Sequence, residues 1–118
     1  MLRAIKHLLK RNSLWLAILV TIAIALLSLI KIESTQPINI KYLDKLLHLI
    51  SYVVLSFLWF TAFIKSKKII LVFTSCIAYG VLLEFLQAQT GYRTYEYADM
   101  LANSLGVLIG YLIFSKLF

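Results

Sequence analysis

Four long apolar runs separated by short polar stretches make up almost the whole chain. They cover about residues 13–31, 44–64, 69–89 and 98–115, and each is close to the roughly 20 residues that a membrane-spanning helix needs. The stretches between them hold the single proline and many of the charged residues, as expected of connecting segments. The pattern predicts four spanning helices in a single domain, residues 1–118.

Composition supports the same class of protein. Hydrophobic residues make up 62% of the chain and charged residues 14%, with a mean hydropathy of +0.91, which lies far from the usual composition of a soluble domain. We therefore expect an all-α fold, an integral membrane four-helix bundle. Cys76 stands alone within an apolar run, so the sequence predicts neither a disulfide framework nor a thiol-rich metal site.

The basic residues predict the topology. The formal net charge is +7, but the lysines and arginines lie at the ends of apolar runs, a pattern of membrane topology and anionic lipid contact and not of nucleic-acid binding. Eight of the twelve fall near the two termini or at residues 65–68. The positive-inside rule then places both termini in the cytoplasm, in a multi-pass protein of the cytoplasmic membrane. A cleaved signal peptide is a weaker alternative, because LSLIKIES offers no small-residue cleavage site.

Three of the expected helices carry polar residues on one face. In a four-span chain, the start of the second helix, the end of the third and the start of the fourth lie on one side of the membrane. Small glycines beneath the polar positions favour close helix contact. We therefore expect the three faces to line one outward-facing pocket roughly two turns deep. The faces are Asp44, His48 and Tyr52; Gly80, Glu84 and Gln87; and Asp99, Asn103, Gly106 and Gly110.

Two ionisable side chains, Glu84 and His48, fall inside the expected spans. A charged residue deep in a spanning helix costs roughly 2.5 to 3.5 kcal/mol, so Glu84 and His48 are expected to find partners or to face water. The expected partners are Arg93 or Lys45 for Glu84, and Asp44 or Asp99 for His48. Polar pairs of this kind also serve to lock helix register. Five ionisable groups around one mouth exceed that need, which favours a functional site.

The same residues resemble a known family. The stretch DKLLHLISYVVLSF is similar to the opening motif of the VanZ-like family, in which an aspartate and a lysine precede a histidine and an aromatic residue. Glu84 and Gln87 match its later ExxQ, and Arg93 lies six residues before Asp99. Asn103, Gly106 and Gly110 complete the match, which spans residues 44–110.

The resemblance has implications and exceptions. It implies a small multi-helix envelope protein of a family named for a member that gives low-level resistance to the glycopeptide teicoplanin; it does not supply a mechanism. Two positions differ from the pattern: Glu96 stands where a small hydroxyl residue is common, and Tyr92 where a proline is common. Both changes bear on the loop before the last helix.

Binding is the first of three functional hypotheses. Arg93 holds a phosphate or carboxylate with both arms of its guanidinium, and tyrosines lie at the headgroup level. The ligand is a membrane lipid headgroup, a cell-wall precursor or a glycopeptide such as teicoplanin. The predicted ligand-binding residues are Lys45, Tyr52, Gln87, Arg93 and Asn103, with Asp44, His48 and Glu84 orienting the ligand.

Catalysis is the second hypothesis. His48, held by Asp44, acts as general base, Glu84 or Asp99 as acid, and Arg93 stabilises the anion during hydrolysis or transfer on a lipid-linked phosphate. The third hypothesis is a structural or accessory membrane subunit. His48 with Asp44, Asp99 or Glu84 is a weak zinc pattern and fits magnesium or calcium only as a minor alternative, so no metal site and no cofactor is predicted. Transport ranks lower, because four short helices leave little room for alternating access unless the protein forms a homo-oligomer.

Overall fold

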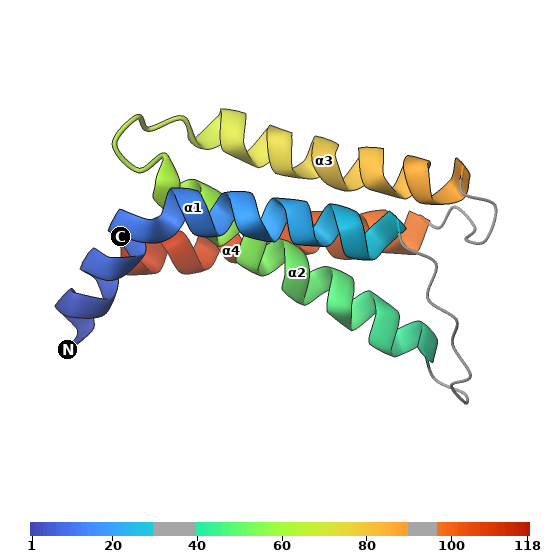
Figure 1. The fold of residues 1–118 in the computed structure, drawn as a ribbon, viewed down its shortest axis with the longest axis horizontal. Coiled ribbons are helices and arrows are strands. Elements are labelled where there is room, and N and C mark those ends of the chain that lie inside the picture. The colour runs from blue at the N-terminus through green and yellow to red at the C-terminus, as the bar shows by residue number, and fades with distance from the viewer. Residues whose placement is uncertain (30–39, 90–96) are drawn as a thin grey trace.

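The computed structural model describes residues 1–29, 40–89 and 97–118, with side chains from residue 45 onward in the second range. These ranges form four helices: α1 (Leu2–Leu29), α2 (Ile40–Ala62), α3 (Ile69–Gln89) and α4 (Tyr97–Leu117). Each is long and apolar enough to cross a membrane. The predicted all-α, four-span architecture is therefore confirmed (Figure 1).

Two helices begin earlier than the apolar runs predicted. α1 begins at Leu2 and not near residue 13, because the basic opening segment contains no glycine or proline and places Ile5, Leu8 and Leu9 at helical spacing. α2 begins at Ile40, four residues before residue 44. The two connections predicted before α2 and α4 fall mainly at residues 30–39 and 90–96, outside the described residues.

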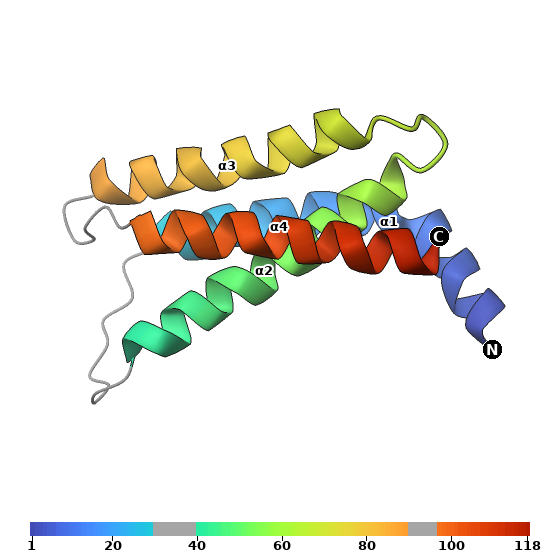
Figure 2. The ribbon, with the colours of Figure 1, turned by 180° about the vertical axis from the view of Figure 1, so that it is seen from behind.

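The helices define two ends of the bundle. Both chain termini lie at the same end as the α2–α3 link, residues 63–68, as an even number of spans requires (Figure 1). We call this the link end, and the opposite end, where α2 and α4 begin, the loop end. Toward the loop end α2 and α3 move apart. α1 and α4 both lie between them there, α1 at the front of the bundle in Figure 1 and α4 at the front in Figure 2.

α2 and α4 pack backbone to backbone. A methyl group added at Gly106 would lie 2.6 Å from the Leu49 carbonyl oxygen, and one added at Gly110 would lie 2.7 Å from the Val53 carbonyl oxygen. Ser56 Oγ also donates to the Val107 carbonyl at 3.3 Å. The glycine pair therefore permits the close helix approach expected from the sequence, and it fixes the register of the two parallel helices.

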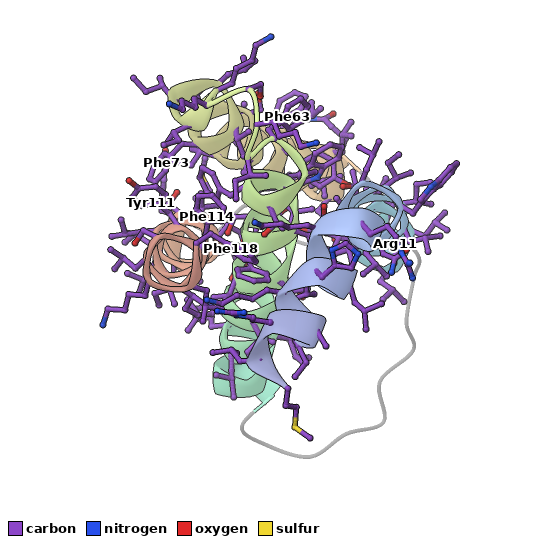
Figure 3. All side chains as sticks on the ribbon, turned by 90° about the vertical axis from the view of Figure 1, so that its left-hand side faces the viewer. Arg11, Phe63, Phe73, Tyr111, Phe114 and Phe118 are labelled. Atoms are coloured by element: carbon purple, nitrogen blue, oxygen red, sulfur yellow. The ribbon has the colours of Figure 1, made fainter. Side chains whose placement is uncertain are left out.

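Aromatic rings fill the link end. Phe60 stacks on Phe114 with centroids 5.6 Å apart and tilts against Tyr111 at 5.2 Å. Phe73 and Phe118 extend this cluster across α3 and α4 (Figure 3). Ring packing therefore contributes much of the contact between helices at the link end.

Thr21 fastens α1 to two neighbours. Its hydroxyl accepts a hydrogen bond from Trp59 Nε1 at 2.9 Å and donates to the Ala17 carbonyl at 2.7 Å. The Tyr79 hydroxyl donates to the Thr21 carbonyl. One residue of α1 therefore binds both α2 and α3, a role that the sequence pattern did not indicate.

Candidate functional site

Two polar contacts join α2 to α4 at the loop end. Lys45 Nζ lies 3.4 Å from Asp99 Oδ1 in a salt bridge. One turn deeper, His48 Nδ1 lies 3.0 Å from Asn103 Oδ1. Because α2 and α4 run parallel, spacings of three and four residues keep both contacts in register. The sequence had placed these residues on facing helices but had not paired them in this way.

The histidine contact sets the state of the ring. An amide oxygen only accepts hydrogen bonds, so in this contact His48 Nδ1 is the donor and Asn103 Oδ1 the acceptor. A histidine held through one nitrogen presents the other in a defined direction. Asn103 is thus a polar partner of His48 that the sequence did not suggest, and the partner roles suggested for Asp44 and Asp99 stay predictions.

α3 contributes two buried polar side chains at the same end. Glu84 and Gln87 are each 2% exposed, and Gln87 Nε2 donates to the Ser28 carbonyl of α1 at 2.9 Å. Ser28 lies in the last turn of α1, where backbone carbonyls lack partners within the helix. This link to α1 was missed from the sequence, although unsatisfied carbonyls at a helix end could have suggested it.

The contacts of Gly80 show the register of α3 relative to α2 and α4. A methyl group added there would lie 3.2 Å from Asn103 Nδ2 and 3.2 Å from Tyr52 Cε1. Glu84 is one helical turn closer to the loop end than Gly80, and His48 is one turn closer than Tyr52. The structure therefore brings Glu84 and His48 to one level of the bundle, with α4 in contact with both of their helices.

We call Lys45, His48, Glu84, Gln87, Asp99 and Asn103 the polar cluster. Asp99 and Asn103 are buried like the two α3 residues, whereas the Lys45 side chain remains 23% exposed. Buried polar groups in a low-dielectric setting interact strongly with one another and with any charge brought to them. Four members of the cluster are therefore buried, and Lys45 is a partly exposed cation beside them.

Tyr52 lies one helical turn deeper in the bundle than His48. It is 2% exposed, its ring lies 6.4 Å from that of Tyr79, and it packs beside Gly80 and Gly106. The sequence had suggested it as a ligand-binding residue. In the structure its contacts are those of a packed core side chain.

Several predicted site residues belong to the segments outside the described residues. Arg93 and the loop residues Tyr92 and Glu96 lie outside the described residues, and so does the Asp44 side chain, although its backbone belongs to α2. Among the side chains that are described, no three histidine, cysteine, aspartate or glutamate groups converge as a metal site would require. The roles suggested for Asp44 and Arg93 stay predictions.

Comparisons with known proteins bear on this arrangement. The family model described as VanZ/LLP1 matches residues 2–118, a range that includes all four helices and every member of the polar cluster. Comparison with curated proteins and with solved structures gives no match.

Proposed function

This chain is a multi-pass membrane protein that belongs to the VanZ/LLP1 family, and from that premise we propose that its polar cluster binds the anionic headgroup of a membrane lipid or lipid-linked cell-wall precursor. One observation carries the proposal. The partly exposed Lys45 holds Asp99 at the entrance to a group of buried polar side chains. Polar and ionisable groups gathered inside a membrane bundle mark binding or reaction sites by default.

The proposed orientation places this site outside the cell. Eight of the twelve lysines and arginines belong to the chain termini and the α2–α3 link, and the positive-inside rule assigns that end to the cytoplasm. The loop end then faces the outer leaflet, where cell-wall precursors and glycopeptides are met. Both termini are cytoplasmic in this proposal.

The cluster offers complementary chemistry to a phosphate. Lys45 supplies a cation that an incoming anion shares with Asp99, and His48, fixed by Asn103, supplies a directed ring nitrogen. Arg93, in the loop before α4, adds a guanidinium that binds two oxygens at once. A glycopeptide such as teicoplanin is the alternative ligand of the same site.

Catalysis is a second candidate, favoured by the histidine geometry. With the Nδ1 proton donated to Asn103, the Nε2 lone pair can accept a proton from an attacking water. Glu84 or Asp99, protonated before the reaction, donates its own proton to the leaving oxygen of a lipid-linked phosphate, and the proton taken up by His48 restores the acid afterwards. Asp44 is a further candidate to hold the imidazole. The catalytic set in this case is His48, Asp44, Glu84 and Asp99.

Ligand-induced stabilisation tests the proposal. Protein in phosphatidylcholine nanodiscs is unfolded by heat with a polyprenyl pyrophosphate, with the corresponding polyprenol, or with teicoplanin. We expect the pyrophosphate to stabilise the fold by about 2.7 kcal/mol at a hundredfold excess over Kd, and the uncharged polyprenol to have no comparable effect. Release of phosphate from the first ligand would identify catalysis in place of binding alone.

Variants define the site in this experiment. Lys45→Gln and His48→Ala are each expected to weaken pyrophosphate binding by about tenfold or more, since a hydrogen bond to a charged group contributes about 1.5–3 kcal/mol. Lys65→Gln, at the opposite end of the bundle, is the matched control and should bind as the unmodified protein does. Equal stabilisation by the polyprenol, or variants that bind normally, would favour the structural-subunit hypothesis.

A further inference from the structure

A cavity lies between α1, α2 and α3 in the half of the bundle near the link end. Its volume is about 320 Å³, about twice that of a 150 Å³ apolar cavity able to hold benzene. The walls are largely apolar, and Phe63, Leu71 and Ser75 at its edge are exposed. Deeper lining residues include Leu55, Val72 and Tyr79. In a spanning bundle, such an edge faces the hydrocarbon of the bilayer.

A cationic rim adjoins this cavity. Lys67 and Lys68 line a smaller space of about 50 Å³, which shares Phe63 and Val72 with the larger one. Both lysines are exposed, as is Lys65 in the same link. Figure 3 shows Phe63 beside the link, whereas Arg11 lies on the far side of α1. The charged residues that line the two spaces are Lys67 and Lys68 of the link.

We propose that the cavity binds one acyl chain of an anionic phospholipid from the leaflet at the link end, with the lipid phosphate on Lys67 and Lys68. The apolar cavity accommodates the acyl chain, and the lysines beside it bind the negative headgroup of the same lipid. Basic residues at a membrane surface attract anionic lipid in this way. This site shares no residue with the polar cluster and does not depend on the function proposed for it.

Fluorescence quenching tests the proposal on the full chain. Trp59 lines the cavity, and Trp15→Phe leaves it as the only tryptophan. The protein is reconstituted in phosphatidylcholine vesicles containing equal fractions of either dibrominated phosphatidylglycerol or dibrominated phosphatidylcholine. We expect the anionic lipid to bind preferentially, by about fivefold for each lysine that it contacts, and so to quench Trp59 more strongly. Lys67→Gln with Lys68→Gln should abolish the preference, while Lys116→Gln, a control at the same end on α4, should retain it.

A second variant tests the chain-binding part. Ser75→Leu adds bulk at the exposed edge of the cavity and is expected to reduce quenching by both brominated lipids. Ser115→Leu, the same change at an exposed position of α4 away from the cavity, should leave quenching unchanged. Equal quenching by the two lipids in the Trp15→Phe protein would overturn the proposal. So would a Ser75→Leu variant in which only the oligomeric state changes, since a second copy of the chain would then be the occupant.

Discussion

Gly106→Ala and Gly110→Ala are each expected to lower the free energy of unfolding by about 1–3 kcal/mol, the usual cost of overpacking a tight interface. Alanine favours the helix over glycine by about 1 kcal/mol, so the same substitution at a solvent- or lipid-exposed helix position would be stabilising. Here the added methyl group meets the carbonyl oxygens of Leu49 and Val53, and backbone atoms of α2 cannot move aside without separating the helices. Unfolding in mixed micelles, followed by circular dichroism, measures the loss.

Gly80→Ala provides the control for this prediction. Its added methyl group would meet side-chain atoms of Asn103 and Tyr52 at 3.2 Å, and side chains can shift by a few tenths of an ångström. We expect a smaller loss than at Gly106. Alanine variants at Gly106 and Gly110 that match or exceed the stability of the unmodified protein would contradict the α2–α4 packing described above.

Glu84→Leu is expected to abolish pyrophosphate binding while leaving the free energy of unfolding equal or higher. Glu84 is buried within the span of α3, and a carboxylate at depth costs roughly 2.5 to 3.5 kcal/mol that leucine does not. On the function proposed above, this carboxylate contributes to ligand binding at the expense of stability. Thermal unfolding with and without ligand measures both effects.

Two outcomes separate function from structure in this variant. Glu84→Gln keeps the size and hydrogen-bonding capacity of the side chain without its charge, so it should fold normally and bind more weakly. A loss of about 3–5 kcal/mol in Glu84→Leu would be typical of breaking a buried ionic contact. It would show that the carboxylate holds the bundle together, and the structural-subunit hypothesis would then be preferred.

The architecture was predictable because a bilayer leaves few options. A chain with four apolar runs near 20 residues long must fold them as helices, since backbone polar groups in hydrocarbon need partners within the segment. Hydropathy alone failed at the start of α1, where basic residues interrupt the apolar run but do not interrupt the helix. At the start of α1, the basic residues therefore indicate where the membrane is expected to begin, whereas helix propensity determines where the helix begins.

The site was predictable only in part. Periodicity grouped His48, Glu84 and Asn103 on inward faces of their helices, and span parity assigned them to one end of the membrane. Neither property says which helices are neighbours, and the pairing of His48 with Asn103 follows from the parallel contact of α2 with α4. Tyr52 shares a periodic face with His48 but lies one turn deeper, where the two glycine contacts enclose it in the core.

The distance from His48 to a bound phosphate is the most direct test of the binding site. His7→Gln leaves His48 as the only histidine, so ¹⁵N-labelled histidine and the ³¹P nuclei of a polyprenyl pyrophosphate form one reporter pair for solid-state NMR in bilayers. We expect dipolar coupling that corresponds to hydrogen-bond reach between a ring nitrogen and a phosphate oxygen. A ligand that binds the protein while its phosphorus shows no coupling to the His48 ring would contradict the proposed site.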